Sequence, residues 1–528
     1  MATKSTSTSA PGTAESGNGA ENRNGSMDLR TCLDRMRDLG LVVQIDDPID
    51  WDIEAGAVMR YANEHGSPAQ LFTNIKGAMP GASLLGGLWA TYPRIAVILG
   101  LPPETSYHDL IDYYGEGFAR RIKPTVVDSG PCQQNVMLGD EVDLFKFPIP
   151  KFTPVDGGRY IGTMTNCVTK DPDSDWVNWG TYRSQVFDQR TCGVWANPAN
   201  HGGMIVKKHA ERGETTEYVQ FFGGDPVYSI VAGSGCPYGV SEVEVAGGIR
   251  GEPVKLVKCK TVDLYVPADA EIVVEGTVYP AETREEGPFG EYAGYATMEV
   301  QKRPVCKVSA VTYRDDPIFP GTCLGIPSSD ELIQTLYAPP EVKERLAVQG
   351  LPNCKVAVWM QSGLSAIVVS TPQGVEKPRS MGAHEQEFHP TMPNRVLYAG
   401  IPQRIASTVW STHWGSFYPY VIVVDDDVDP ANTGQVLHAL FTKCNPIRDI
   451  HIYPGYGNSP ILPYLPKGPL WNALYGGGNC LLDCTWPLEW QSEDIPVRIG
   501  FDTSYPPDIR EKVVANAKKW GLVDGKPR

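Results

Sequence analysis

Apolar residues recur at three- and four-residue spacing near the start of the chain, at Leu29, Leu33 and Met36. This spacing places them on one face of a helix, and Asp28 directly before them is a favourable N-cap. Helical patterns then alternate with short apolar runs, which predicts an N-terminal α/β domain over residues 27–124. The other elements predicted in this domain are a strand at 41–45, a helix at 53–63, strands near 71 and at 95–99, and a helix at 107–122.

The pattern changes between Val136 and Arg314, where short runs of β-branched residues are separated by Gly and Pro. Many short strands with such turn residues are typical of a β-barrel or a β-sandwich. We therefore expect the middle of the chain to fold as β-structure. The predicted strands cover residues 162–169, 204–207, 218–222, 227–232, 254–257, 271–278 and 305–312.

The last third of the chain returns to alternating helical and strand patterns, which predicts a C-terminal α/β domain over residues 326–528. The apolar strand 420–424 is followed by aspartates at 425, 426, 427 and 429, which form either a cation site or a solvated strand end. An amphipathic terminal helix at 507–520 is expected to pack on a neighbouring domain or subunit. The remaining predicted elements are helices at 330–336 and 404–410 and strands at 356–359 and 366–369.

The charge of the chain limits its partners. Its 528 residues carry a formal net charge of −16, which argues against binding to nucleic acid or to an anionic membrane, because phosphate groups attract clustered Lys and Arg. No apolar run approaches the roughly 20 residues needed to span a bilayer. The expected partner is therefore a small molecule or another protein.

The cysteines indicate the compartment. All twelve are scattered, and no two are separated by only two residues, so neither a zinc ribbon nor a dithiol redox motif is present. Free thiols in a long chain fit a reducing compartment, and we expect a cytoplasmic protein. Residues 1–26 are rich in Ser, Thr, Gly, Asn and Ala and lack an apolar signal core, which predicts a disordered tail.

Two glutamates flank a short turn in residues 284–295, which we call the glutamate loop. Glu286 and Glu291 lie on either side of the run Gly-Pro-Phe-Gly, and a proline between two glycines rules out a regular helix. A loop that follows a strand can aim both carboxylates into one cavity, where their proximity separates their pKa values and gives a proton donor beside an anion. The alternative is a solvated acidic turn.

Further candidate ligands lie in the middle of the chain. Asn178, His201 and Glu242 together offer nitrogen and oxygen ligands suited to a manganese-like divalent ion. Arg183, beside Tyr182, is well shaped to bind a substrate carboxylate through two parallel hydrogen bonds. For each residue taken alone, the plainer role is a turn cap, a surface histidine or an ion-pair partner.

The order of short motifs along the chain is more informative than any single residue. A set of motifs in a fixed order is much more specific than one motif alone. The motifs are Asn-x-Gly-x-Tyr-Arg at 178–183, His-Gly-Gly at 201–203, Ser-Glu at 241–242, Leu-Val-Lys-Cys at 256–259, Glu-Gly-Pro-Phe-Gly-Glu at 286–291, Ile-Val-Val-Asp-Asp-Asp at 422–427 and Tyr-Pro-Pro-Asp at 505–508.

This series closely resembles the UbiD family of prenylated-FMN-dependent decarboxylases, from about residue 28 to the carboxyl end. The resemblance implies a mixed α+β, multidomain fold. A central split β-barrel, similar to that of flavin reductases, would bind the flavin in residues 125–325 and lie between the two α/β domains. The resemblance also implies that residues 326–528 form a homodimer or homohexamer, and that a flavin prenyltransferase supplies the cofactor.

The resemblance further implies a role for each matched residue. Prenylated FMN would be held by its phosphate through a divalent ion, usually Mn²⁺, with K⁺ nearby. Arg183 would orient the carboxylate of a small aromatic acid, Glu286 would hold Arg183, and Glu291 would protonate the carbon that loses CO₂. The implied metal ligands are Asn178, His201 and Glu242, and the implied cofactor-binding residues are these three with Trp179, Gly180, Thr181, Tyr182, Arg183 and Asn200.

The motifs are most similar to those of the hydroxybenzoate branch, which implies reversible, non-oxidative decarboxylation of a phenolic acid such as a hydroxybenzoate, protocatechuate or gallate. One departure is that residues 405–442 contain no Lys or Arg, where cinnamate-type relatives have a lysine that contacts the flavin phosphate. His413 is the candidate substitute. The alternatives are a cinnamate-type or heteroaromatic acid as substrate, a non-catalytic flavin-binding relative, and a metal-dependent hydrolase that uses the same residues.

Overall fold

The chain forms two compact units. The first unit consists of residues 1–340, 360–364 and 461–464, and the second consists of 341–359, 365–460 and 465–528. The predicted tail, residues 1–26, lies outside the part that the structure describes, and the predicted division into three domains stays a prediction. The structure is a computed structural model that describes residues 27–197, 199–372, 400–454, 461–465, 477–487, 490 and 492–522.

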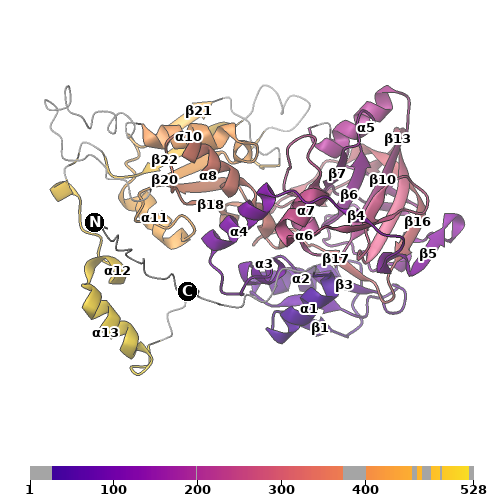
Figure 1. Cartoon of the computed structure of the whole chain (residues 1–528), viewed down its shortest axis with the longest axis horizontal. Coiled ribbons are helices and arrows are strands. Elements are labelled where there is room, and N and C mark those ends of the chain that lie inside the picture. The colour runs from indigo at the N-terminus through magenta and orange to yellow at the C-terminus, as the bar shows by residue number, and fades with distance from the viewer. Residues whose placement is uncertain are drawn as a thin grey trace, which may run out of the picture. The chain divides into compact units, whose positions relative to one another are not determined.

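The first helix forms where the apolar spacing predicts it. Helix α1 (Leu29–Asp38) is capped by Asp28, whose carboxylate accepts a hydrogen bond of 2.9 Å from the Thr31 N–H. The N-terminal segment that begins with α1 also supplies three strands of a four-stranded sheet, and the fourth strand comes from far along the chain (Figure 1). In sheet order the strands are β1 (Val42–Ile45), β2 (Ala69–Phe72), β3 (Ser83–Gly86) and β17 (Ile318–Gly321), and the helices that follow α1 are α2 (Glu54–Glu64), α3 (Tyr92–Ile98) and α4 (Tyr107–Ala119).

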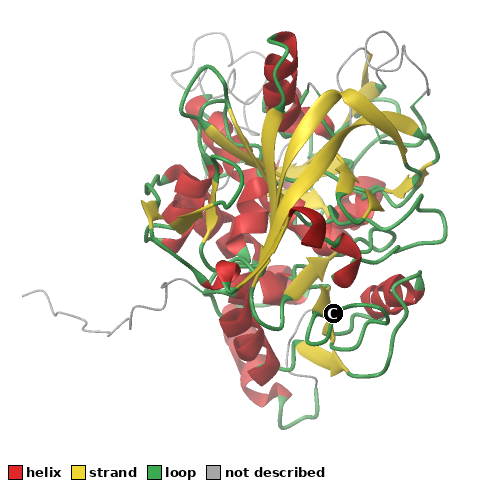
Figure 2. Ribbon diagram, turned by 90° about the vertical axis from the view of Figure 1, so that its right-hand side faces the viewer, coloured by secondary structure: helices red, strands yellow, loops and turns green. Residues whose placement is uncertain are grey.

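An antiparallel sheet of eight strands forms the middle of the first unit. Its two longest strands, β13 (Ile272–Glu286) and β16 (Gln301–Tyr313), pair with register shifts, and the long strands are strongly twisted (Figure 2). The path of pairing does not close, so the structure shows an open sheet and the predicted split barrel is not confirmed. In sheet order the strands are β7 (Val177–Gly180), β6 (Asn166–Lys170), β10 (Thr216–Phe222), β13, β16, β9 (Thr191–Gly193) and β8 (Val186–Asp188), and β5 (Asn135–Leu138) also pairs with β16. A separate three-stranded sheet has the order β12 (Tyr265–Pro267), β11 (Lys255–Lys258) and β4 (Thr125–Val126). A two-stranded sheet consists of β14 (Phe289–Gly290) and β15 (Ala296–Thr297).

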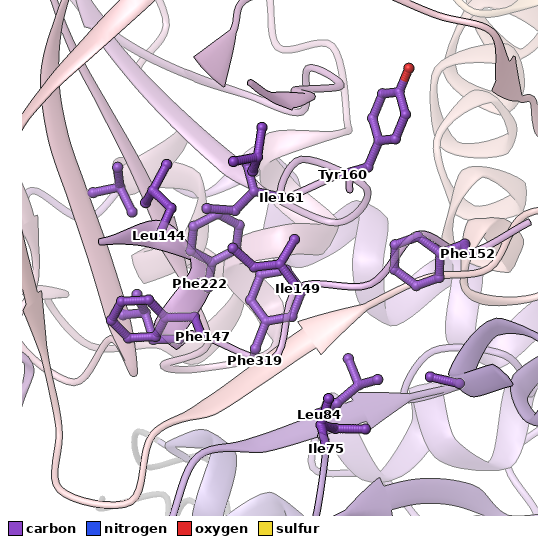
Figure 3. Packing of buried hydrophobic residues seen from close by; sticks show 14 of the residues in the cluster. Ile75, Leu84, Leu144, Phe147, Ile149, Phe152, Tyr160, Ile161, Phe222 and Phe319 are labelled. Atoms are coloured by element: carbon purple, nitrogen blue, oxygen red, sulfur yellow. The ribbon is translucent and has the colours of Figure 1, made fainter. Parts of the chain in front are cut away.

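One hydrophobic core joins the N-terminal segment to the eight-stranded sheet (Figure 3). Leu84 of β3, Phe222 of β10 and Phe319 of β17 are each at most 1% exposed, and burying a side chain of this size contributes about 1.5–3 kcal/mol. Tyr160 belongs to the same cluster, but its hydroxyl points away from the labelled apolar side chains (Figure 3). The core therefore fixes the ring of Tyr160 and leaves its hydroxyl free to meet a polar partner.

Several short apolar runs predicted as strands are helices. The runs 95–99 and 227–232 are buried throughout, so their sequence shows no periodicity that separates a helix from a strand. One signal was present: the Asn200 side chain accepts a hydrogen bond from the Gly203 N–H and caps the helix that follows. The corrected segments are 95–99 in α3, 204–207 in α5 (His201–Glu211) and 227–232 as α6 (Val227–Ala232); the next helix is α7 (Glu242–Arg250).

The second unit contains a mixed sheet of five strands. The predicted strands at 356–359, 366–369 and 420–424 are confirmed. None of the twelve cysteines of the chain forms a disulfide bond. No helix in the described ranges is both long and apolar enough to cross a membrane. The sheet order is β18 (Val356–Trp359), β19 (Ala366–Ser370), β20 (Tyr420–Val424), β22 (Gly478–Cys484) and β21 (Ile450–Pro454). The later α-helices within the described residues are α8 (Ala338–Val348), α10 (Ile401–Ser411), α11 (Thr433–Thr442), α12 (Phe501–Ser504) and α13 (Pro507–Ala517).

Candidate active site

A separate segment of the chain, at Asp156 and Gly157, contacts the glutamate loop and fixes its backbone. Strand β13 ends at Glu286, and Glu291 follows β14, which pairs with β15. Asp156 Oδ1 accepts a hydrogen bond of 3.0 Å from the backbone of β14. Gly157 packs so closely on the loop that a Cβ there would overlap the carbonyl oxygen of Gly287. The predicted non-helical segment is confirmed, and both acids lie at strand ends.

Arg183 connects the two glutamates. Its Nη2 donates to Glu286 Oε2 at 2.9 Å, and its Nη1 donates to Glu291 Oε1 at 2.5 Å. The exposed fractions of the three side chains, in the order Arg183, Glu286 and Glu291, are 10%, 3% and 14%. The structure thus brings together the three residues predicted to be catalytic, with one cation between two carboxylates. We call them the Arg-Glu-Glu cluster.

Glu291 is the member of the cluster whose surroundings favour a bound proton. Burial raises the pKa of Glu291 above its ordinary value, and the nearby Arg183 offsets part of this effect. Burial alone would lower the pKa of Arg183, but Glu286 and Glu291 raise it, so the guanidinium stays charged. Glu291 is therefore suited to hold a proton at a pH where an ordinary glutamate has lost it.

Three residues that sequence reasoning missed surround the cluster. The guanidinium carbon of Arg183 lies 4.2 Å from the centre of the Trp195 ring, and that of Arg303 lies 3.6 Å from the same centre. The Tyr160 hydroxyl donates to Glu286 Oε1 at 2.8 Å. Because an indole face attracts cations, the Trp195 ring helps to fix the orientation of Arg183.

One of these three residues lies on a strand that pairs with the strand of Glu286. In the pairing of β13 with β16, Arg284 lies opposite Arg303. Side chains two positions apart on a strand share a face, so this register places Arg303 on the side of the sheet that carries Glu286. Trp195 and Tyr160 come from loops, and no local pattern connects either residue with the glutamates.

Two of the three predicted metal ligands are in contact. Asn178 Nδ2 lies 3.3 Å from Glu242 Oε1, and the Trp179 N–H donates to Glu242 Oε2 at 2.8 Å. His201 begins α5, and the residue after it donates its N–H to the Tyr182 hydroxyl at 2.9 Å. That hydroxyl donates to Asn178 Oδ1 at 3.1 Å. The first turn of α5 therefore joins the same hydrogen-bond network.

The imidazole of His201 lies among aromatic rings near this network. Its centre is 5.0 Å from that of the Trp176 ring and 5.9 Å from that of the Tyr238 ring, both edge-on. Trp176 precedes β7, and its Nε1 donates to the Val240 carbonyl at 3.0 Å. His201 is thus held between the segments that carry the other two predicted ligands.

The three predicted ligands are of types that suit a divalent cation. Burial raises the pKa of Glu242 to about 8, and the Trp179 N–H and the Asn178 amide oppose this effect. A cation beside Glu242 would supply positive charge, and an amide oxygen, an imidazole and a carboxylate are suitable ligands for Mn²⁺. Among the residues that the structure describes, no three or more His, Cys, Asp and Glu gather as a metal site, so a site here depends on the Asn178 amide.

The aromatic rings of the predicted flavin segment face the protein interior. Trp179 is 2% exposed and Tyr182 is 9% exposed. Gly180 and Gly202 leave room for the Tyr182 ring, because a Cβ at either position would overlap it. These two rings shape the site from behind, and the Trp179 backbone contacts Glu242 directly.

Thr181 and Asn200 differ in their capacity to bind a ligand. Thr181 Oγ1 is buried and has no hydrogen-bond partner within the described residues, so a bound ligand could satisfy it. Asn200 already uses its side-chain oxygen to accept a hydrogen bond of 2.8 Å from the Gly203 N–H. The Asn200 amide nitrogen is the part of this side chain that the cap does not use.

The aspartates after β20 pair with a lysine. Asp425 is 3% exposed and accepts a hydrogen bond of 3.0 Å from Lys443 Nζ, which also lies 3.6 Å from Asp427. The alternative of a solvated strand end is therefore wrong for Asp425. His413 is exposed, and its backbone N–H donates a hydrogen bond of 3.3 Å to Glu341 Oε1. Its contact with a flavin phosphate stays a prediction.

An arginine held between two glutamates that are largely shielded from solvent is an arrangement suited to acid–base chemistry. Comparison with protein families identifies the class further. The chain matches three domains of 3-octaprenyl-4-hydroxybenzoate carboxy-lyase: the N-terminal domain over residues 33–114, the Rift-related domain over 125–327 and the C-terminal domain over 386–484. The chain belongs to the UbiD family of carboxy-lyases, as the sequence motifs predicted.

Its relatives act on several types of aromatic acid. Pyrrole-2-carboxylic acid decarboxylase of Pseudomonas aeruginosa is 32% identical over 510 residues, covering 94% of this chain and 99% of the relative. Ferulic acid decarboxylase 1 of Saccharomyces cerevisiae is 29% identical over 514 residues, covering 94% and 99%. The open form of vanillic acid decarboxylase from Sedimentibacter hydroxybenzoicus has a similar structure, with a TM-score of 0.77 and 27% identity over 94% of this chain and 99% of that chain.

Proposed function

We propose that the chain catalyses reversible, non-oxidative decarboxylation of a small aromatic carboxylic acid, with prenylated FMN as its cofactor. The Arg-Glu-Glu cluster supports this function because it provides a cation for a carboxylate and a proton donor for carbon. The decarboxylases of pyrrole-2-carboxylic, ferulic and vanillic acids, to which the chain is similar, support the substrate class.

The observation that carries the proposal is an unused donor on Arg183. Its two terminal nitrogens bond to the glutamates, whereas its Nε is buried and has no hydrogen-bond partner in the described part of the chain. Leaving a buried donor unpaired costs about 1–3 kcal/mol. A substrate carboxylate would accept this hydrogen bond, and its binding would place the scissile bond near Glu291.

The residues of the cluster then take different parts in the reaction. Arg183 binds and orients the carboxylate, and ionised Glu286 holds Arg183 and balances its charge. Protonated Glu291 delivers its proton to the ring carbon that has lost CO₂. In the reverse direction, ionised Glu291 removes the proton from that carbon.

A cofactor is needed because the electron pair of the broken C–C bond requires an acceptor, and prenylated flavin supplies this electron sink when it is bound. Asn178, His201 and Glu242 would hold the divalent ion, for which we propose Mn²⁺, with K⁺ nearby. The raised pKa of Glu242 and the unpaired Thr181 hydroxyl are the features that favour a bound cation and cofactor here.

A phenolic acid is the first candidate substrate, because the motifs at 178–183 and 201–203 are most similar to those of the hydroxybenzoate branch. A heteroaromatic acid is the second candidate. It is favoured by the 32% identity with a pyrrole-2-carboxylic acid decarboxylase over 94% of the chain.

The test is CO₂ release by protein produced together with a flavin prenyltransferase. The holo-protein is incubated separately with hydroxybenzoates, vanillate, ferulate and pyrrole-2-carboxylate in D₂O. We expect at least one acid to lose CO₂ and to gain deuterium at the vacated carbon. When the same protein is incubated with labelled bicarbonate and the decarboxylated product, the label should appear in the carboxyl group of the acid that is formed.

Glu291→Gln tests the proton donor. This variant should keep the flavin spectrum but lose roughly 10²–10⁴-fold in kcat, the range typical of a general acid. Glu285→Gln is a matched control, because Glu285 is an exposed glutamate of the same glutamate loop, and it should keep full activity. Full activity of Glu291→Gln, or turnover by apo-protein with Mn²⁺ alone, would contradict the proposed function.

A further inference from the structure

Tyr160 lies at the boundary between the hydrophobic core and the Arg-Glu-Glu cluster. Its side chain is 0% exposed, and its hydroxyl points away from the labelled apolar residues (Figure 3). The hydroxyl oxygen lies 2.8 Å from Glu286 Oε1, 3.1 Å from the Pro288 carbonyl and 3.3 Å from Gln185 Oε1. A hydroxyl has one proton, and the nearest acceptor, which carries the negative charge, receives it.

We propose that Tyr160 is a positioning residue that keeps Glu286 ionised and aimed at Arg183, so that the catalytic proton stays on Glu291. The inference rests on the decarboxylase function proposed above. The hydrogen bond from Tyr160 to Oε1 leaves Oε2 of Glu286 to Arg183, at 2.9 Å. Without this bond, the two carboxylates would compete for one proton across the same guanidinium.

Several charged groups surround Glu286. Arg183 bonds to it directly, and Arg303 Nε lies 3.8 Å from its Oε2. The facing acids are Glu291, on the other side of Arg183, and Asp156, which acts on Glu291 through its charge. Glu286 therefore has a hydroxyl and a guanidinium as donors and a second guanidinium close by, whereas Glu291 is bonded by the Arg183 guanidinium that it shares with Glu286.

Tyr160→Phe isolates the effect of the hydroxyl. The ring of Tyr160 lies 4.4 Å from that of Phe289, centre to centre, and this packing remains in the variant. We expect kcat to fall roughly ten- to a hundredfold, the size expected for a lost hydrogen bond to a charged group, while KM changes little. The acid limb of the pH–rate profile should move to higher pH, because Glu286 loses a donor that favours its ionised form.

Tyr160→3-fluorotyrosine provides a second variant that keeps the shape and the hydroxyl of the side chain. Fluorine makes the phenol more acidic and thus a stronger hydrogen-bond donor. The acid limb should therefore move to lower pH, in the direction opposite to that of Tyr160→Phe. Shifts in the same direction for both variants would overturn the inference, whatever their effect on stability.

Tyr228→Phe is the matched control. Tyr228 is also buried, and its hydroxyl also donates to a carboxylate, Asp269 Oδ1, at 3.3 Å. This variant removes the same group from a similar setting outside the cluster. Tyr228→Phe should therefore keep the parental pH–rate profile. The same shift of the acid limb in Tyr228→Phe and Tyr160→Phe would show a general loss of stability and overturn the inference.

Infrared difference spectra separate failure of this inference from failure of the proposed function, because they need no turnover. At a pH where the parent is active, the difference between the parent and Glu291→Gln should show one protonated carboxyl group. In the Tyr160→Phe background, the Glu286→Gln difference should show protonation that is absent in the parent. If these spectra are seen without CO₂ release, the proposed function fails and the positioning role stands. If Tyr160→Phe keeps the parental spectra and pH profile, the inference is wrong.

Discussion

At the scale of single residues, the site depends on an asymmetry between two glutamates that share one arginine. The sequence predicts the pair, because the run Gly-Pro-Phe-Gly between Glu286 and Glu291 forces a turn. It does not predict the surroundings that distinguish the two acids. Tyr160 and Arg303 approach Glu286 from other parts of the chain, and burial acts on Glu291 only in the folded protein.

The asymmetry predicts how the reaction depends on pH. Burial raises the pKa of Glu291, so this acid stays protonated above the usual range of a glutamate. The decarboxylation rate should be maintained up to that raised pKa and should fall as the pH rises through it, because the proton donor is lost. The measurement is kcat of the holo-protein against pH. A rate that stays constant on the alkaline side would exclude Glu291 as the donor.

At the scale of elements, local patterns predicted the long strands and failed for short buried runs. Strands β10, β13 and β16 lie where β-branched residues recur between turn residues. By contrast, every residue of α6 (Val227–Ala232) is buried, so its apolar run has no polar face to reveal a helix. Closure of a sheet is also not a local property, so the strand pattern that favoured a barrel could not predict whether the middle sheet closes.

Gly157→Ala tests how the segment at Asp156 and Gly157 holds the glutamate loop. A Cβ at this position would overlap the backbone of Gly287, so the two segments must separate, which costs roughly 1–3 kcal/mol. We expect a lower thermal midpoint and a larger loss in kcat than in flavin binding, because Glu291 moves away from the substrate. In the control Gly434→Ala, the nearest atom to the new Cβ is Asn432 Oδ1 at 3.4 Å, so the thermal midpoint and kcat should both stay at the parental values. Parental kcat in Gly157→Ala would show that this contact does not position the loop.

At the scale of the whole molecule, the chain contributes distant segments to each unit. Residues 360–364 and 461–464 belong to the first unit, although they come from the last third of the chain. Strand β17 likewise completes a sheet that begins near the N-terminus. Local periodicity carries no information on such long-range pairing, so the sequence predicts which elements form better than it predicts which elements belong together.

Glu271 connects the beginning of the chain to the middle of the first unit. It is 0% exposed, accepts hydrogen bonds of 3.0 and 2.9 Å from Arg30, and lies 3.3 Å from Arg314 Nη1. Glu271→Gln removes the charge that balances two guanidinium groups. Loss of one partner of a buried ion pair costs about 3–5 kcal/mol, and the value here should be near the lower end because Arg30 is 34% exposed.

Chemical denaturation followed by intrinsic fluorescence measures this effect. Glu271→Gln should shift the first unfolding transition to lower denaturant, whereas its folded form should keep the parental kcat because Glu271 makes no contact with the Arg-Glu-Glu cluster among its described hydrogen bonds. The control is Glu282→Gln, which breaks an exposed pair with Lys307 at 2.7 Å and should cost at most about 1 kcal/mol. Equal shifts in the two variants would mean that the buried carboxylate does not hold α1 on the sheet, and that the apolar face of α1 alone attaches it.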